Sequence, residues 1–456
     1  MLNALLAVAA LLAIGLALRA NLRVLRVLYI PASVVAGVIG FAAAQVLLRV
    51  PAAAPQAGAV TATLFAWPNV LIAVVFAGLL LEGGSDKTFG QSLRRGARSG
   101  ALAWIIILGQ IALGLIVYAT LVRPRHPQVP AAFGQLLEVS WAGGHGSSAA
   151  MGKVYEGLEF PAGRDLAFFL ATVGLIYGVT SGLVLVNVAV RRGWTAGGVR
   201  GAIPLVSGLE PRHDPPPTMF ARTRTEVLDP LTLQAVVLLA AFGVGYGLQQ
   251  AFVWLATHVI GLTDPDVLRG VNNVPLFLFT LLGGWAVRRA MQWLRCGDLI
   301  DRPSLHRLQG LAMDVLIVAA VTTMRVDALR SFVVPVVALI VLGGAWAAVC
   351  LLVIAPRLLP RAYWFELGLL NYGFSTANTP QGLMLLRIVD PELKTGAAED
   401  YAVAAPLSAP FIGGGILTVA VFPIVLANVN PWVAVGVLLI AAIVLYVVGR
   451  RLSDAG

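Results

Sequence analysis

The sequence predicts an all-α membrane protein. Of its 456 residues, 59% are hydrophobic and only 12% are charged, and the mean hydropathy is +0.86. A typical soluble domain carries about 25% charged residues, so this chain has too little charge to cover a surface that faces water. Apolar runs of about 18 residues or more recur along the chain, long enough to cross a hydrocarbon core of about 30 Å as a helix. The lipid bilayer is therefore the expected solvent.

The apolar runs predict about eleven transmembrane helices plus two re-entrant hairpins. The expected spans are 2–18, 28–48, 60–81, 100–121, 165–190, 231–255, 273–290, 308–324, 331–355, 401–427 and 432–449. Two further stretches, 131–152 and 362–386, are apolar but rich in Gly, Ser, Thr, Asn and Pro. Non-helical backbone is tolerated within a membrane only where protein or a wet cavity satisfies it, so we interpret both stretches as re-entrant hairpins.

The basic residues predict the orientation. With the N-terminus outside, 24 of the 32 lysines and arginines fall on the inner side, as the positive-inside rule requires. The eight on the outer side are Arg49, Arg123, Arg125, Lys153, Arg164, Arg269, Arg325 and Arg330. The net charge of +10 therefore reflects the membrane topology and does not indicate a nucleic-acid partner. We expect a multi-pass protein of a bacterial inner membrane.

The order of the predicted elements repeats. Four spans, a hairpin and one span occupy 1–190, and the same order returns in 231–427, starting from the opposite side. Two like units of opposite orientation are typical of secondary transporters, whose substrates bind near the midplane where the units meet. Residues 191–230 form a predicted cytosolic linker, and 428–456 add a C-terminal helix and tail.

The first hairpin is rich in glycine and serine, which allow close approach of backbone and offer oxygens to a hard cation such as Na⁺. The second hairpin contains Pro380, which favours a broken helix whose free ends attract ions. The alternatives are tight helix packing for the first segment and a proline-kinked span for the second. Candidate Na⁺ ligands are Ser147, Ser148, Ser375 and Thr376.

Three titratable residues are candidates for the site. One interpretation of His145 is a ligand contact or a proton-linked group. The alternative is a hydrogen-bonded structural residue. Asp314 and Glu366 are carboxylates near span ends, and intramembrane carboxylates suggest function. Both are also close enough to those ends to be interfacial.

At the two hairpins the sequence resembles the sodium/glutamate symporter family of bacterial inner membranes. The family's Ser-Gly-Gly-His-Gly-Thr-Gly-Ala-Ala type segment matches Ala142 to Ala150, and its Cys-Gly-Phe-Gly-Leu-Gly-Ala-Thr-Pro type segment matches Tyr372 to Pro380. The resemblance implies Na⁺-driven uptake of glutamate by an elevator-like homodimer, with no other cofactor. The candidate binding residues are Gly143, Gly144, His145, Gly146, Ser147 and Ser148 from one hairpin, and Asn371, Gly373, Ser375, Thr376, Asn378, Thr379 and Pro380 from the other.

The chain departs from this family in three places. An Asp in the penultimate span is replaced around Gly413–Gly415, Ser148 replaces a glycine, and Asn371-Tyr372 replaces a His-Cys pair. An acidic partner for a substrate ammonium or for Na⁺ is thereby missing from the pattern. Substrate identity and the choice between Na⁺ and H⁺ coupling therefore stay open.

A channel and an intramembrane enzyme are the two alternatives to a transporter. A channel would share the hairpins but needs a continuous pore, whereas an inverted repeat favours alternating access. An intramembrane enzyme could use His145 and Ser147 as base and nucleophile, but no Gly-x-Ser-x-Gly elbow or His-Glu-x-x-His motif is present. We therefore expect a transporter and not an enzyme.

Overall fold

The fold is built from helices alone throughout the part of the chain that the structure describes. This computed structural model describes residues 1–27, 30–81, 89–196, 229–259, 276–390, 394–408 and 411–454, and those ranges contain no strand. Most of the predicted linker, 197–228, lies outside them.

The first half of the chain contains α1 (Leu2–Asn21), α2 (Arg23–Val27), α3 (Ala32–Leu47), α4 (Ala54–Leu79), α5 (Phe89–Val117), η1 (Tyr118–Val122), η2 (Ala131–Gln135), α6 (Leu136–Trp141), α7 (Gly144–Gly157) and α8 (Ala162–Arg192). The second half begins with α9 (Pro230–Trp254), η3 (Leu255–Val259), α11 (Leu276–Trp293), η4 (Gly297–Leu299), α12 (Arg302–Thr322), α13 (Val326–Ser331), α14 (Val333–Val349), η5 (Cys350–Ile354) and α15 (Ala355–Leu358). It ends with α16 (Trp364–Thr376), α17 (Thr379–Val389), α18 (Ala397–Ser408), η6 (Leu417–Val421), α19 (Phe422–Asn428) and α20 (Pro431–Asp454).

Eight helices in the described ranges are long and apolar enough to cross a membrane. They are Leu2–Asn21, Ala54–Gly78, Gly96–Val122, Ala162–Arg192, Leu231–Val259, Arg302–Thr322, Val333–Leu358 and Pro431–Arg451. The chain is therefore an all-α, multi-pass membrane protein. Of the other predicted spans, 28–48 corresponds to the 16-residue α3, and 273–290 corresponds to the 18-residue α11, which carries Arg288 and Arg289.

One predicted span is wrong. The sequence predicts a single helix over 401–427, but α18 ends at Ser408 and helical structure resumes only at Leu417. Gly413 and Gly414 lie between them with φ of 66° and 95°, the left-handed region that a right-handed helix cannot contain. The glycine run breaks this segment within its apolar stretch.

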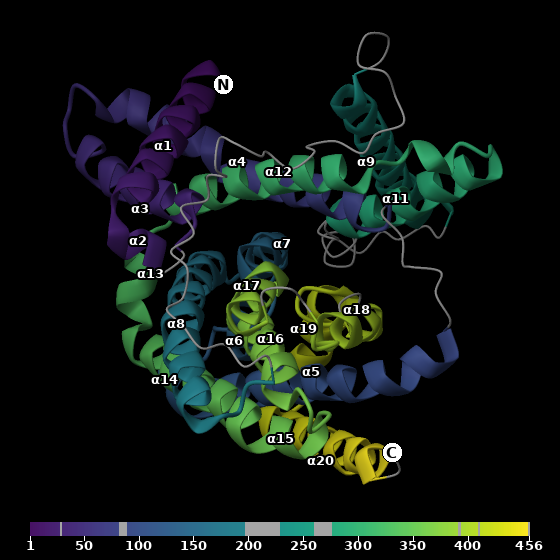
Figure 1. The fold of residues 1–456 in the computed structure, drawn as a ribbon. Coiled ribbons are helices and arrows are strands. Elements are labelled where there is room, and N and C mark those ends of the chain that lie inside the picture. The colour runs from purple at the N-terminus through teal and green to yellow at the C-terminus, as the bar shows by residue number, and fades with distance from the viewer. Residues whose placement is uncertain are drawn as a thin grey trace.

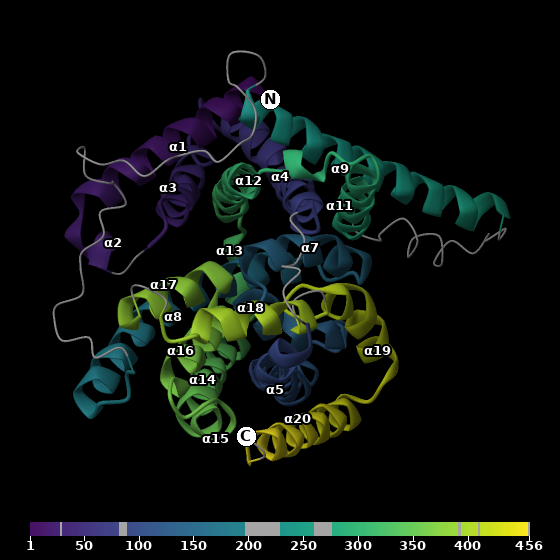
Figure 2. The same ribbon diagram turned by 45° about the vertical axis from the view of Figure 1, so that its right-hand side comes forward.

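The helices form two layers (Figures 1 and 2). One, the scaffold layer, consists of α1, α3, α4, α9, α11 and α12. The other, the hairpin body, consists of α5 to α8 and α14 to α20 with their short connecting turns. Its two largest apolar clusters lie around the two predicted hairpins, one containing Phe133 and Phe168, the other Phe365 and Leu385.

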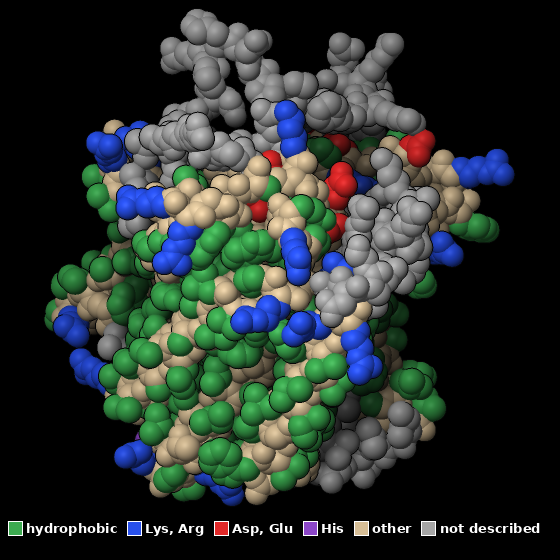
Figure 3. Space-filling view, turned by 60° about the horizontal axis from the view of Figure 1, so that its bottom comes forward, with side chains coloured by type: hydrophobic (Ala, Val, Ile, Leu, Met, Phe, Trp, Pro, Cys, Tyr) green, Lys and Arg blue, Asp and Glu red, His purple; other side chains and the backbone are tan. Residues whose placement is uncertain are grey.

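The surface of the hairpin body suits lipid. In the face drawn in Figure 3, hydrophobic side chains cover most of the lower part, whereas the acidic side chains lie in its upper part. Helix α20 shows the reason, since Val437, Ile440 and Val444 are all exposed by more than half of their surface. Such continuous apolar exposure would be unfavourable in water and is expected in a bilayer.

The scaffold layer is held by close glycine contacts that recur in its two halves. A Cβ on Gly15 of α1 would overlap the Ala32 carbonyl at the start of α3, and a Cβ on Gly283 of α11 would overlap the Ala241 carbonyl of α9. Helix α3 of the first half packs on α12 of the second half, and α11 of the second half packs on α4 of the first. This is the packing expected of an inverted repeat, which itself stays a prediction. Small residues give such contacts in membranes because they let backbones approach.

Replacing Gly283 by Ala should destabilise the scaffold layer. The added methyl group overlaps backbone atoms of Ala241 and Gly245, and overpacking of this kind costs roughly 1–3 kcal/mol. The thermal unfolding midpoint of the purified protein in detergent should fall. Gly243→Ala is the matched control on α9, since a Cβ there meets nothing within 4 Å. Equal midpoints for both variants would contradict this packing.

Candidate functional site

Helix α8 positions both hairpins. Its first half packs on α7, where His145 Nε2 lies 3.0 Å from Thr172 Oγ1. Its second half packs on α16 and α17, where Gly178 lies against Thr376 and Gly182 against Leu385. The two hairpins therefore extend along α8 from opposite ends, and their breaks meet near its middle.

The first hairpin consists of η2, α6 and α7. The chain turns back on itself at a break. Phe133 precedes the break and Phe160 follows α7, yet their rings lie 6.1 Å apart. Helix α6 ends at Trp141 and α7 begins at Gly144, which has φ of 64°. The left-handed conformation favours glycine here. The helical arms extend beyond the predicted limits of 131–152, since α7 continues to Gly157.

The second hairpin consists of α16 and α17. The two helices lie in backbone contact, because a Cβ on Gly373 would be 2.5 Å from the Cα of Gly382. Helix α16 ends at Thr376, and Asn378 caps α17 by accepting a hydrogen bond of 3.0 Å from the Gln381 amide. Pro380 lies in the first turn of α17, where its missing amide proton is not needed. The side chain of Pro380 lies outside the described residues.

The tips of the two hairpins touch. A Cβ on Gly144 would be 2.5 Å from the Ala377 carbonyl oxygen and 3.9 Å from the Asn378 Cβ. Gly144 begins α7 and Asn378 caps α17, so the N-termini of these two helices meet at the contact. Free amides and the positive end of the helix dipole make a helix N-terminus attractive to anions. Two of them side by side can hold a carboxylate group.

A third chain segment crosses this contact. It is the glycine break between α18 and η6, where Ser147 Oγ donates a hydrogen bond of 3.1 Å to the Gly413 carbonyl. Gly414 lies so close that a Cβ there would overlap Ser147 Oγ. Gly413 also lies near Phe374 of the second hairpin. Backbone from three broken helices therefore converges at one depth.

Glu138 brings a negative charge to the same place. This fully buried residue of α6 accepts hydrogen bonds of 2.8 Å at Oε1 from the Gly413 amide and from Thr418 Oγ1. Its other oxygen, Oε2, is buried and has no hydrogen-bond partner among the described residues. Gln135 supports the cluster by donating 2.9 Å to the Thr418 carbonyl. An unneutralised carboxylate in such a place calls for a bound cation or proton.

Glu138 is not among the site residues predicted from the sequence. A signal was available, since it is the one carboxylate within 131–152 and intramembrane carboxylates suggest function. The two acids named instead lie elsewhere. Asp314 is exposed, and Glu366 accepts a hydrogen bond from the Ala196 amide at the end of the second hairpin away from the tip. The sequence pattern lacks an acid near Gly413–Gly415, and in the structure Glu138 of α6 lies beside Gly413.

Other predicted residues of the first hairpin face away from the tip contact. His145 bonds to Thr172 and its ring lies 6.4 Å from that of Phe168, so its side chain is directed to α8. Gly146 faces the scaffold layer, where a Cβ would lie 3.1 Å from Ile72 Cδ1 and 3.3 Å from Met313 Cε. The structure therefore gives His145 the surroundings of a hydrogen-bonded structural residue.

The four hydroxyls predicted as Na⁺ ligands all donate to backbone carbonyls. The acceptors are Gly413 for Ser147, Gly144 for Ser148, and Tyr372 for both Ser375 and Thr376. Their oxygen lone pairs are not used by these bonds and can still coordinate a cation. Ser147 is the member of this set that reaches the glycine break.

The remaining predicted residues anchor the second hairpin to its neighbours. Asn371 donates 3.2 Å to Ser99 Oγ on α5, and Thr379 Oγ1 lies 3.1 Å from the Tyr401 hydroxyl on α18. The Ser375 carbonyl accepts a hydrogen bond of 2.8 Å from Gln110, another buried residue of α5 that the sequence did not single out.

Comparison with models of protein families, with curated proteins and with solved structures gives no match. Across the described ranges, no group of three or more His, Cys, Asp or Glu residues could hold a metal ion. The chemistry of the site is therefore that of helix ends, hydroxyls and one carboxylate.

The tip contact can be tested by cross-linking. In a variant whose two native cysteines are replaced by Ser, we expect Gly144→Cys with Asn378→Cys to form a disulfide on mild oxidation once the tip shifts to relieve the contact of the new Cβ with the Ala377 carbonyl, because the two Cβ atoms would be 3.9 Å apart. Mass spectrometry of the linked peptides provides the measurement. The control pair, Gly146→Cys with Asn378→Cys, should stay reduced because Gly146 faces the scaffold layer. Equal linking of both pairs would show that the tips are not arranged as described.

Proposed function

We propose that this protein is an ion-coupled secondary transporter that takes up a small organic anion, with glutamate as the first candidate substrate and Na⁺ as the first candidate coupling ion. The observation that carries the proposal is the meeting of two broken helices, tip to tip, beside a buried carboxylate. Broken helices at membrane depth are tolerated where they bind solutes, and their N-termini favour anionic groups.

The site offers separate places for an anion and for a cation. The N-termini of α7 and α17 meet at Gly144 and Asn378 and can hold a substrate carboxylate. Glu138 Oε2, buried and unpartnered within the described chain, can bind a cation or a proton. A substrate ammonium group is a second possible partner for this carboxylate. Because the anion and the cation neutralise each other across a small distance, binding of one favours the other, which is the basis of symport.

The contact between the two layers supports an elevator-like motion. Near the first hairpin tip, α7 meets α4 and α12 through the flexible ends of Ile72 and Met313. The polar contacts are at the start of α8, where Arg164 donates a hydrogen bond of 2.7 Å to the Phe65 carbonyl and Asp165 accepts one from the Arg325 backbone. A mostly apolar interface can slide without breaking many hydrogen bonds. The homodimer and the bacterial inner membrane remain implied by the resemblance alone.

Proton coupling is the second candidate, and Glu138 is the observation that favours it. A carboxyl group at this site could alternate between protonated and ionised forms as the site opens to each side. The enzyme alternative receives no support, because His145 bonds to Thr172 and Ser147 donates to a carbonyl, so the two are not arranged as base and nucleophile.

Uptake of labelled glutamate into proteoliposomes tests the proposed substrate and ion. We expect accumulation that requires an inward Na⁺ gradient and saturates with substrate, with aspartate, malate and citrate as competitors that define the substrate class. Uptake driven by a pH gradient without Na⁺ would assign coupling to H⁺. Single-channel currents in place of saturable uptake would exclude a transporter.

Glu138→Gln tests the coupling site. The amide retains an oxygen that can accept from Gly413 and Thr418 but removes the negative charge, so folding should persist while ion binding weakens. Loss of a hydrogen-bonded charge costs about 1.5–3 kcal/mol, which is roughly 10- to 100-fold in the ion concentration needed for half-maximal uptake. The matched control is Glu366→Gln, which removes a buried carboxylate away from the tip. An unchanged ion dependence in Glu138→Gln would rule out this role.

A further inference from the structure

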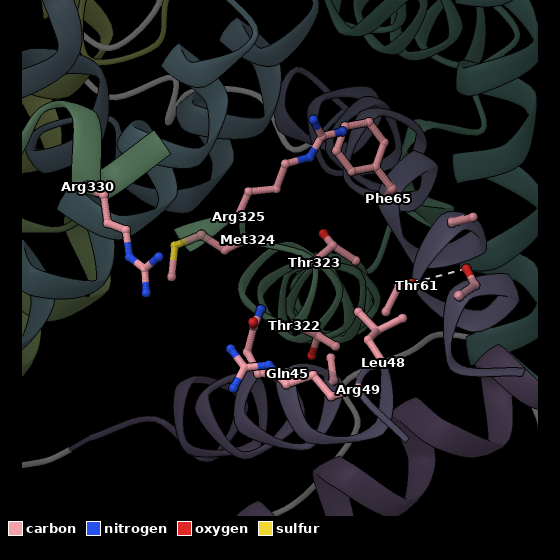
Figure 4. A pocket seen from close by; sticks show the side chains of 13 residues that line it. Gln45, Leu48, Arg49, Thr61, Phe65, Thr322, Thr323, Met324, Arg325 and Arg330 are labelled. Atoms are coloured by element: carbon pink, nitrogen blue, oxygen red, sulfur yellow. Dashed lines mark hydrogen bonds between the residues drawn. The ribbon is translucent and has the colours of Figure 1, made fainter. Parts of the chain in front are cut away.

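The scaffold layer contains a cavity of about 590 Å³ that is distinct from the hairpin tips. It lies between the end of α3, the start of α4, the end of α12 and the chain leading into α13. Figure 4 shows Gln45 on α3, Arg49 just after the end of α3, Arg325 beside Phe65, and Arg330 on α13. Along α4 and α12 the cavity is about ten residues, or roughly 15 Å, from the contacts that Ile72 and Met313 make near the tip.

The charge of this cavity is entirely positive. Arg49, Arg325 and Arg330 line it, and none of its lining residues is acidic. Beside the cavity, the Asp165 carboxylate accepts a hydrogen bond from the Arg325 backbone and interacts electrostatically with both Arg164 and Arg325. Among the described residues, the side chains of Arg49 and Arg330 form neither an ion pair nor a hydrogen bond. These two cations therefore have no counter-charge among the described side chains.

Neutral hydrogen-bonding groups complete the lining. Thr322 is 6% exposed, lines the cavity, and its hydroxyl has no hydrogen-bond partner within the described ranges. The Gln45 side chain, near the end of α3, and Arg49, just after it, both line the cavity. The Thr322 hydroxyl oxygen itself is fully buried against Gly40 of α3, so it packs between the helices and does not reach the cavity.

The distribution of basic residues gives an independent reason to assign a function. The positive-inside rule disfavours basic residues on the outer side, yet Arg49, Arg325 and Arg330 belong to the eight placed there by the predicted topology. Three of these eight gather around one cavity. Guanidinium groups bind carboxylates and phosphates through paired hydrogen bonds, and the volume suits a small organic anion.

We propose that this cavity is a binding site for a small oxyanion, a carboxylate or a phosphate, on the outer side of the protein. Its position on that side rests on the proposed function and topology, but anion binding itself does not. A site of this kind concentrates anions near the scaffold before they reach the hairpins, because clustered positive charge steers anions into a concave surface. The anion can come from solution or from the headgroup of an acidic lipid.

Arginine modification in the full-length protein tests the site directly. The protein is reconstituted in nanodiscs of phosphatidylcholine and treated with phenylglyoxal, and peptide mass spectrometry measures the modification rate at each arginine. With succinate or inorganic phosphate present, Arg49 and Arg330 should react about threefold or more slowly than in chloride, as expected at a ligand concentration a few times the Kd. Arg123, an exposed arginine outside the cavity, is the control and should be unaffected.

Nanodiscs of phosphatidylglycerol distinguish the two sources. Protection there without added anion assigns the site to a lipid headgroup, and protection by succinate or phosphate in phosphatidylcholine assigns it to a soluble anion. Equal reactivity of Arg49, Arg330 and Arg123 in every condition would overturn the proposal. This readout needs no transport, so it can succeed or fail independently of glutamate uptake.

Variants provide a second measurement. Arg49→Gln together with Arg330→Gln should remove the anion protection of Arg325, while Arg123→Gln should leave it intact. The unfolding midpoint of the double variant should stay within the range of the control, since neither guanidinium forms an ion pair among the described residues. Undiminished protection of Arg325 in the double variant would also overturn the assignment.

Discussion

A helix that is interrupted inside a membrane leaves backbone amides and carbonyls that lipid cannot satisfy, and this constraint organises the hairpin body. The described part of the hairpin body contains three such interruptions, at 142–143, at 377–378 and at 411–416. Each lies close to another, so polar groups exposed by one break face those of the next. The Gly144–Ala377 contact and the hydrogen bond from Ser147 to Gly413 are the closest of these approaches. Because the breaks are gathered at one depth, the apolar arms around them can pack as ordinary membrane helices.

The buried carboxylate of Glu138 adds an acidic group to a polar centre that is otherwise formed by helix ends. Two helix N-termini alone would make a site for anions, and such a site would bind them without regard to cations. The carboxylate is fixed by the Gly413 amide and Thr418, and it adds a place where a cation is needed for neutrality. In the proposed function, the same group would couple the two solutes and oppose binding of an anion alone. This is the physical reason to favour a symporter over a simple anion carrier.

The two layers differ in how they are held. Close glycine contacts join helices within the scaffold layer, whereas side-chain ends such as those of Ile72 and Met313 join it to α7. Backbone contacts resist sliding, while contacts between flexible apolar side chains can be exchanged for similar ones. This difference supports the proposed motion of the hairpin body against a rigid scaffold. The basic cavity belongs to the scaffold layer, so an anion bound there would not have to move with the hairpins.

The sequence by itself determined the membrane class and the location of both hairpin breaks. Hydropathy requires only composition and length, while Gly144 permits a left-handed turn and Pro380 restricts the backbone, both locally. The tertiary structure decided the rest. It broke the predicted span 401–427 at its glycines, directed His145 to α8, and brought Glu138 to Gly413, 275 residues away in the chain. Such pairings depend on how α8 aligns the two hairpins, and no local pattern encodes that alignment.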